Sequence, residues 1–441
     1  MVRTRKSSNL GVDIRGDTSA PAMSTMNEVS PIDAQSPKWD KAIDSTTDKS
    51  SRSHSKRRKN RSSIRRFKDI CLKHTWVLPL LIMTVLLLAY AVNPTPSNPM
   101  HGAIFLSYPQ PPTTPGGPTM YGKGPKDIAF VAFYTIVLSF TREFLMQRMI
   151  RPLAVYCGIR GKGKTARFME QVYTAVYFAI FGPYGLYVMS RTNIWYFNTT
   201  AMFEGFPHRE HEGLFKGYYL LQASYWAQQA IVLLLQLEKP RKDFKELVGH
   251  HIITLALIAL SYRFHFTYIG LAVYITHDVS DFFLATSKTL NYIDSFITPL
   301  YFVCFVGVWI YLRHLLNLKF LWAVLTEFRT VGPFELNWET QQYKCWISQY
   351  ITFTLLATLQ AVNLFWLFLI LRILKNYIFT NVTKDERSDD EEEEEEEEVD
   401  PTVTSAATVA TGIEPSSLTA RSVNADKGTP KVMINGQPLK R

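Results

Sequence analysis

Apolar residues gather into eight long runs, and the segments between them are polar. The runs cover approximately residues 75–92, 127–146, 170–189, 214–237, 247–262, 266–287, 296–318 and 346–376. A hydrocarbon core about 30 Å thick takes about 20 helical residues, a length that these runs reach or approach. The runs are continuous rather than alternating, which argues against a transmembrane barrel. The pattern predicts an all-α polytopic membrane protein with about eight spans.

Two neighbouring runs carry ionisable residues in their apolar background. The stretch 248–292 holds His250 and His251 before a short polar turn, and His277, Asp278 and Asp281 after it. An ionisable side chain in a membrane span costs roughly 2.5–3.5 kcal/mol on insertion, so it marks a functional site by default. We interpret the group as the active centre of a lipid-modifying membrane enzyme.

The spacing of these residues predicts their depth. If the turn centres near position 264, an antiparallel helical hairpin pairs His250 with Asp278 and His251 with His277. Asp278 and Asp281 are three residues apart, so they project from one face of their helix, with Asp281 one turn nearer the membrane surface. The histidines and aspartates are therefore predicted to lie at about the same depth. The sequence leaves open whether the helix faces that carry them point toward each other.

The charge of the chain lies mainly outside the spans. The formal net charge is +10, and residues 51–68 contain nine basic residues and no acidic one. Because this run directly precedes a span, it predicts a cytosolic N-terminus and an anionic membrane surface as its partner rather than nucleic acid. We expect residues 1–74 to be disordered.

The C-terminal segment 381–441 is also predicted to be a disordered cytosolic tail. Thirteen acidic residues lie between Asp385 and Asp400. Ser388 precedes an acidic cluster, as substrates of acidophilic kinases do, and we expect it to be a regulatory phosphorylation site.

Two basic segments could attract phosphate groups, although neither is a nucleotide-binding P-loop. Seven Lys or Arg residues lie between Arg142 and Arg167, and a second basic segment carries Lys239, Arg241 and Lys242. The GKGKT sequence lacks P-loop spacing and follows no strand. The four cysteines are scattered, so neither a disulfide framework nor a metal site is predicted.

Other polar residues mark further candidate positions. Gln222, Gln229 and Gln236 recur every seven residues and should face protein or a cavity rather than lipid, so we expect Gln222 and Gln229 to bind substrate. Asn198 begins a glycosylation sequon if its loop is lumenal. By alternation, residues 313–345 are lumenal, although their positive charge fits that side poorly.

The sequence from His250 to Tyr292 closely resembles the signature of the ceramide synthase, or longevity-assurance, family, whose core is the TLC domain. The flanking segments EKPRKDFKELV, TQQYKCWIS, FWLFLILRIL and KDERSD are similar to the fungal branch in particular. The resemblance covers roughly residues 75–390. It implies a TLC catalytic domain of about six spans at 167–380, preceded at 75–166 by one or two spans, a Pro-rich lumenal loop and a basic cytosolic loop.

The resemblance implies an endoplasmic reticulum enzyme that joins a fatty acyl group, expected to be very long, from acyl-CoA to the amine of a sphingoid base. The catalytic residues would be His250, His251, Asp278 and Asp281. His277, Asn291 and Tyr292 are further candidates for substrate binding. No cofactor is expected beyond acyl-CoA as co-substrate. A small single-span subunit and a homodimer or a heterodimer with a paralogous catalytic subunit are the expected protein partners.

Thioester aminolysis explains why imidazoles and carboxylates would be needed. Histidine, with a reference pKa of about 6.5, is suited to generate a neutral amine. Asp278 is the candidate to orient that ring, and Asp281 to hold the amine or a hydroxyl of the base. Direct attack and an acyl-imidazole intermediate both remain open.

Three other functions are compatible with a multi-span chain. A TLC-domain chaperone is expected to lack the tandem histidines. A transporter using these residues as a proton relay commonly shows repeated spans, which this chain does not. A metal-dependent hydroxylase usually needs more histidines, at H-x₃₋₄-H spacing.

Overall fold

The computed structural model describes residues 65–111, 115–235 and 243–380. The predicted phosphorylation site Ser388 and the segment with Lys239, Arg241 and Lys242 lie outside these residues, as do both predicted tails almost entirely. The elements are α2 Val77–Ala91, α3 His101–Ile104, β1 Pro109–Gln110, β2 Met120–Tyr121, α4 Lys126–Leu145, π-helix η1 Met146–Ile150, α5 Arg151–Tyr156, α6 Lys162–Ser190, 3₁₀-helix η2 Thr200–Met202, β3 His211–Glu212, α7 Gly213–Leu234, α8 Phe244–Arg263, α9 Thr267–Tyr292, α10 Thr298–Trp309, π-helix η3 Ile310–Leu315, α11 Leu316–Thr330 and α12 Trp346–Thr380.

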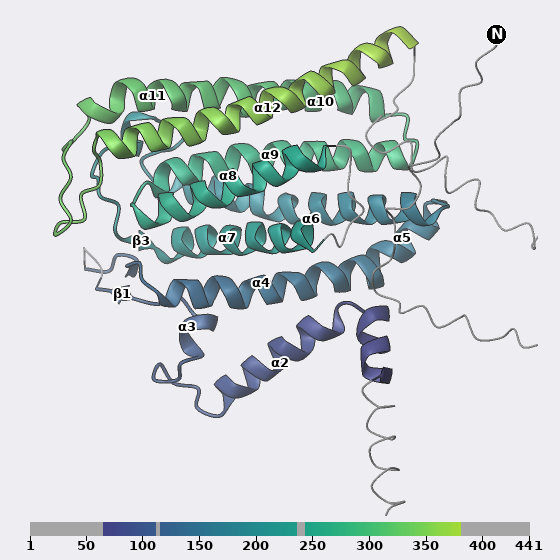
Figure 1. The fold of residues 1–441 in the computed structure, drawn as a ribbon, viewed down its shortest axis with the longest axis horizontal. Coiled ribbons are helices and arrows are strands. Elements are labelled where there is room, and N and C mark those ends of the chain that lie inside the picture. The colour runs from purple at the N-terminus through teal and green to yellow at the C-terminus, as the bar shows by residue number, and fades with distance from the viewer. Residues whose placement is uncertain (1–64, 112–114, 236–242, 381–441) are drawn as a thin grey trace, which may run out of the picture. The chain divides into compact units, whose positions relative to one another are not determined.

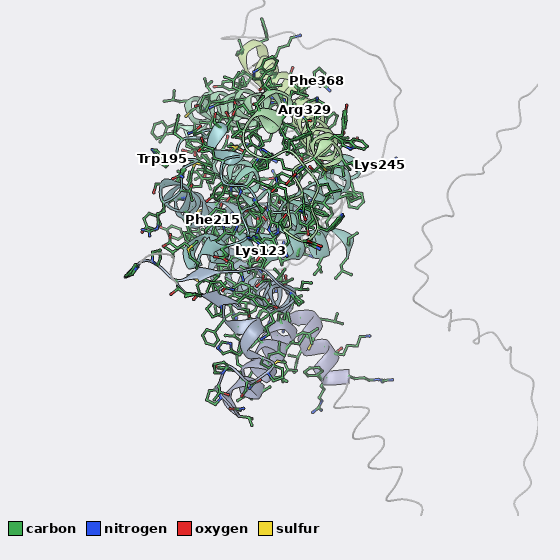
Figure 2. The ribbon with its side chains drawn as sticks, turned by 90° about the vertical axis from the view of Figure 1, so that its left-hand side faces the viewer. Lys123, Trp195, Phe215, Lys245, Arg329 and Phe368 are labelled. Carbon is green, nitrogen blue, oxygen red and sulfur yellow. The ribbon has the colours of Figure 1, made fainter. Side chains whose placement is uncertain are left out.

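Long helices lie alongside one another in the unit that begins at Phe67 (Figure 1). The α6 helix packs along α9, α4 along α7, and α12 against both α11 and α8, while α2 lies against α4. Seen from the end of the bundle in Figure 2, side chains fill the space between the helices, and Trp195 lies at the rim. The predicted all-α membrane fold is confirmed.

The number of spans depends on how polar a spanning helix is allowed to be. Five helical segments among the described residues are long and apolar enough to cross a membrane. A sixth is added if α2 and the short helix before it, which ends at Lys73 and meets α2 at 105°, are counted as one span. The remaining two predicted spans are helices α7 and α9, of 22 and 26 residues. Their hydropathy is lowered by the buried polar side chains that form the candidate site.

The predicted hairpin is present. Helix α8 ends at Arg263 and α9 begins at Thr267, so the turn centres next to position 264 as the sequence predicts. His265 in this turn has a positive φ of 67°. The two helices therefore run antiparallel and carry the tandem histidines and the aspartates at comparable depth.

Two segments that the sequence analysis assigned to loops are largely helical: residues 313–345, assigned by alternation of the spans, and the basic stretch 142–167. Helix continues from Thr298 to Thr330 through η3, so residues 313–330 do not belong to a lumenal loop, and the loop begins only at Val331. Likewise α4, η1, α5 and α6 together cover residues 142–156 and 162–167 of the predicted basic loop, and Arg142 and Arg167 are buried. Basic side chains with protein partners do not need water, so basic residues do not by themselves mark a loop.

A polar cluster joins the segments at one end of the bundle, which we call the turn end. It contains the α8–α9 turn, the three-stranded sheet β1–β2–β3 and the loop 331–345. Lys216 is fully buried, and its Nζ lies 2.7 Å from Asp127 Oδ1 and donates to the carbonyls of Ser107 and Gly122. The ion pair joins α4 to α7, and the two hydrogen bonds to carbonyls join the segment before α4 to α7.

Lys123 links the same segment to the α8–α9 turn. Its Nζ donates to His265 Nδ1 at 3.2 Å, and His265 Nε2 donates to Gln341 Oε1 at 3.1 Å. Burial, and then the charge of Lys216, lower the pKa of Lys123 to about 7, although Asp127 opposes this. Burial, and then Lys123, lower the pKa of His265 to about 3, so this imidazole stays neutral as its two hydrogen bonds require.

Candidate active site

His250 and His277 face each other inside the bundle. Their ring centroids are 6.5 Å apart with planes 19° from parallel, and the residues are 4% and 5% exposed. Trp366 packs edge-on against His250 at 5.0 Å, and Trp226 contacts His250 and His251 at 5.9 Å each. The predicted match in depth is confirmed. Both tandem histidines contact side chains of other helices in the bundle.

Asp278 is fully buried and is bound by α7. Its Oδ2 accepts a hydrogen bond from Tyr218 Oη at 2.7 Å and another from the amide of Gln222. Tyr177 Oη donates in turn to Gln222 Oε1 at 3.2 Å. Among the described residues no histidine ring bonds Asp278, so the predicted Asp278–histidine hydrogen bond is not formed. The other carboxylate oxygen, Oδ1, is buried without a hydrogen-bond partner in the described chain.

Asp281 lies one turn further along α9 and has a different partner. Its Oδ1 is 2.5 Å from Nη2 of Arg313, which η3 supplies. The side chain of Asp281 is 17% exposed, against 2% for that of Arg313. The two aspartates, three residues apart on α9, therefore have different partners: neutral donors from α7 bind Asp278, and a cation from η3 binds Asp281.

Backbone carbonyls fix the tautomers of two histidines. Nδ1 of His277 lies 2.8 Å from the carbonyl oxygen of Val273, and Nδ1 of His251 lies 2.9 Å from that of Leu247. Because a carbonyl only accepts, each Nδ1 carries the proton and each Nε2 carries the lone pair. His277 Nε2 is buried without a hydrogen-bond partner among the described residues. Such a nitrogen can accept a proton or attack a carbonyl carbon.

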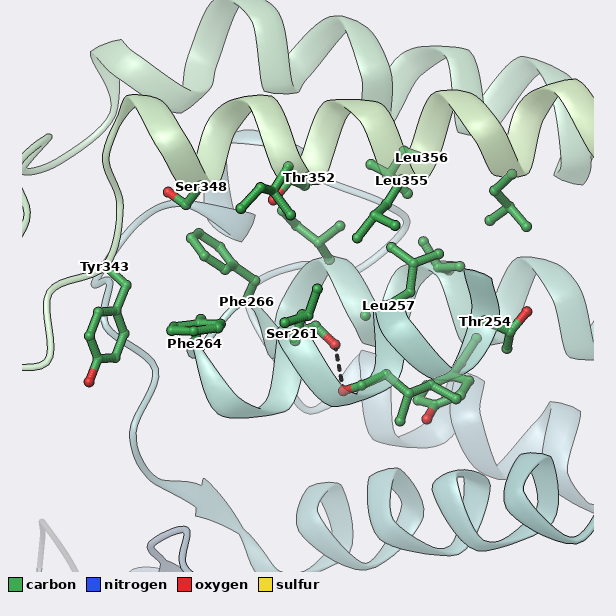
Figure 3. A pocket seen from close by; sticks show the side chains of 18 of the residues that line it. Thr254, Leu257, Ser261, Phe264, Phe266, Tyr343, Ser348, Thr352, Leu355 and Leu356 are labelled. Atoms are coloured by element: carbon green, nitrogen blue, oxygen red, sulfur yellow. Dashed lines mark hydrogen bonds between the residues drawn. The ribbon is translucent and has the colours of Figure 1, made fainter. Parts of the chain in front are cut away.

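An apolar cavity of about 240 Å³ leads away from His277 toward the turn end. It runs between α8 and α12 (Figure 3), from Thr254 near His250 to Phe264 and Tyr343. The ten-residue step from Thr254 to Phe264 corresponds to about 15 Å along a helix. Tyr219 Oη and Ser261 Oγ, two of its few polar groups, bond each other at 2.5 Å. The lining suits a hydrocarbon chain whose polar end lies at His277.

Several predicted substrate-binding residues do not meet this centre. Gln222 does, but Gln229 is only partly buried and Gln236 lies outside the described residues. Asn291 and Tyr292 follow Asp278 by 13 and 14 residues, roughly 20 Å along α9, at the end of that helix. Asn198 is exposed, and the hydroxyls of Thr199 and Thr200 in its sequon both bond Glu327. Glycosylation there stays a prediction.

Sequence reasoning missed residues that complete the site. Tyr218 looks like an ordinary aromatic residue of a span, and nothing in its spacing marks it. Arg313 could have been found, because it lies within an apolar run and the rule applied to the aspartates applies to it equally. Assigning residues 313–345 to a loop hid that signal.

Comparison with known proteins identifies the family of the chain. Residues 167–372 match the TLC domain family model. Over 326 residues the chain is 54% identical to sphingosine N-acyltransferase-like protein FUM17 of Gibberella moniliformis, an alignment that covers 73% of this chain and 84% of that protein. Sphingosine N-acyltransferase lac1 of Schizosaccharomyces pombe is 55% identical over 315 residues, 71% and 81% of the two chains.

Ceramide synthase LAG1 of Saccharomyces cerevisiae is 52% identical over 325 residues, 73% of this chain and 78% of that protein. The chain belongs to the ceramide synthase (sphingosine N-acyltransferase) family. The predicted recognition is confirmed, and the chain is a multi-pass membrane enzyme rather than a chaperone. Sequence reasoning and structure thus agree on where this ceramide synthase places its histidines and aspartates within the TLC domain.

Proposed function

We propose that this enzyme transfers a very-long-chain fatty acyl group from acyl-CoA to the amine of a sphingoid base, forming a ceramide and releasing CoA. The names of its relatives support sphingoid bases as acceptors. The observation that carries the proposal is the apolar cavity with His277 in its lining and the ring of His250 6.5 Å from that of His277. A fatty chain would occupy the cavity with its thioester carbonyl at the imidazoles.

The buried imidazoles support two chemical routes. In direct attack, the amine nitrogen bonds to the thioester carbon, an imidazole nitrogen takes the amine proton, and the C–S bond breaks to release CoA thiolate. In the other route, one of the tandem histidines attacks the thioester first, CoA leaves, and the amine then displaces imidazole from the acyl-histidine. In both routes a neutral histidine is required at the start, and His250 packs among Trp226, Trp366 and His277.

Asp278 would act through its free oxygen. Tyr218 and Gln222 hold Oδ2, so Oδ1 can accept a hydrogen bond from the incoming amine or from an imidazole that moves when substrate binds. A carboxylate in that position stabilises the positive charge that develops as nitrogen adds to the carbonyl. This replaces the orienting role expected from the sequence alone.

The remaining assignments follow from the sequence. The enzyme is expected in the endoplasmic reticulum membrane with both tails cytosolic, using acyl-CoA as co-substrate and no other cofactor. Its tandem histidines lie near the end of the bundle at which α8 begins, where basic residues would attract CoA phosphates. A small single-span subunit and a second catalytic chain are proposed partners.

Incubation of the purified protein with a mixture of acyl-CoAs and dihydrosphingosine, followed by lipid mass analysis, tests the proposal. We expect N-acylated base whose acyl lengths are a selected subset of the mixture, because the cavity has a finite length. Free CoA should appear in equal amount. Absence of any amide product from folded, solubilised protein would contradict the proposed function.

A further inference from the structure

A π-helical segment directs two consecutive residues into the bundle. Within the continuous helix from Thr298 to Thr330, η3 covers Ile310–Leu315. Arg313 and His314 are 2% and 5% exposed, although consecutive residues of an α-helix point about 100° apart. The wider turn of a π-helix brings them closer to one face, and such segments are frequent at functional sites.

The guanidinium of Arg313 makes four hydrogen bonds to protein groups. Nε donates to Ser280 Oγ at 2.6 Å, and Nη1 donates to Asn363 Oδ1 at 3.2 Å. Nη2 donates to Asp281 Oδ1 at 2.5 Å and to the carbonyl oxygen of His277 at 3.4 Å. The group also lies 4.5 Å from the centre of the Trp309 ring. A planar fork of donors is needed to reach all of these acceptors, which a lysine cannot supply.

Three of the four acceptors belong to a single turn of α9. That turn, from His277 to Asp281, holds the imidazole at the inner end of the cavity and both aspartates. Arg313 therefore fixes the turn of α9 on which the reacting groups stand. A buried ion pair contributes little net stability compared with a well-packed apolar pair. The Arg313–Asp281 pair is therefore poorly explained by a contribution to stability alone.

Arg313 engages only one oxygen of the Asp281 carboxylate. The other oxygen, Oδ2, has no hydrogen bond among the described residues, and the side chain is 17% exposed. The carboxylate is thus held in one orientation with an acceptor still available. A protonated or neutral amine, or a hydroxyl of the base, matches that acceptor.

We propose that Arg313 is a positioning residue that orients Asp281 to bind the polar head of the sphingoid base. This inference rests on the proposed function, because it assigns a substrate group to the same site. It separates the two substrates spatially: the acyl chain lies in the cavity beyond His277, and the head of the base lies beside Asp281.

Steady-state kinetics of Arg313→Lys test the assignment. The lysine keeps the charge but loses the fork, so we expect the KM for the base to rise about tenfold and the KM for acyl-CoA to stay within about twofold. A role that is only structural would not separate the two constants. If both KM values stay unchanged, or rise together, the proposal is overturned.

A double-mutant cycle tests whether Arg313 acts through Asp281. Arg313→Met leaves a buried carboxylate without its cation, and we expect kcat/KM for the base to fall at least about 100-fold. Asp281→Asn should cause a similar loss. If Arg313 works by orienting Asp281, the double variant is no slower than the slower single variant; multiplied losses would overturn the proposal.

Arg329→Met is the matched control. Arg329 also lies on the helix that continues from η3, and its Nε bonds Gln349 Oε1 at 2.8 Å, away from the aspartates. The kcat/KM of the Arg329→Met variant for the base should stay within about twofold of that of the unsubstituted enzyme. Failure of both the unsubstituted protein and this control to form amide would contradict the proposed function itself, whereas selective kinetic effects at Arg313 concern only the inference.

Discussion

At the scale of single residues, the site depends on how closely α6, α7 and α9 approach one another. Tyr218 reaches Asp278 because Gly185 on α6 leaves room for its ring. A Cβ at position 185 would lie 2.5 Å from Tyr218 Oη and 2.9 Å from Ile275 Cγ1. Small residues permit such close approach of helices in membranes. The hydrogen bond to Asp278 therefore relies on the absence of a side chain at position 185.

Gly185→Ala should lower activity by displacing Tyr218. Overpacking of this kind typically costs about 1–3 kcal/mol, and movement of the tyrosine would weaken its bond to Asp278. We expect kcat to fall about tenfold or more in amide-formation assays. Gly182→Ala is the matched control, because its nearest neighbour would be Val279 Cγ2 at 3.7 Å, an ordinary contact. Equal activity of the two variants would show that the approach is not needed.

The sequence identified the ionisable residues of the site but not their partners. Rarity of charge in a span marks His250, His251, Asp278 and Asp281, and helical spacing gives their depth. Neither signal says which neighbouring helix presents Tyr218 or Gln222 to a carboxylate. Those contacts arise from the packing of α7 against α9, which depends on shape rather than on periodicity.

At the scale of elements, α8 and α12 form the two long walls of the cavity. Thr352 of α12 lies about midway along the cavity, between Ser348 and Leu356 (Figure 3). The loop 331–345 contributes Leu336, Trp338 and Tyr343 at the far end. The length of hydrocarbon that fits is therefore set by side chains on α12 and by this loop.

Thr352→Phe should shift the enzyme toward shorter acyl chains. The larger side chain would fill the middle of the cavity, so kcat/KM with the longest accepted acyl-CoA is expected to fall about tenfold relative to shorter ones. Lipid mass analysis of products from an acyl-CoA mixture measures this shift. Thr358→Phe is the control, since Thr358 is exposed on the same helix and does not line the cavity. The same shift in both variants would argue against the cavity as the acyl site.

At the scale of the whole molecule, hydropathy located all eight helical runs and the antiparallel hairpin. The extent of a helix was predicted wrongly where polar side chains find hydrogen-bond partners inside the protein. The helix from Thr298 to Thr330 passes through Arg313 and His314 without interruption, because Asp281, Asn363 and Gln360 provide their partners. Assigning residues 313–345 to a loop by alternation of the spans therefore ended this helix too early.

The central claim is that the buried imidazoles and carboxylates at the head of the cavity perform the acyl transfer. It is tested most directly by amide formation with His250→Ala and Asp278→Asn, each purified beside the unsubstituted protein. Both variants should integrate into the membrane normally and lose at least about 100-fold in rate, because each removes a group placed at the reacting atoms. Unimpaired ceramide formation by either folded variant would contradict the account.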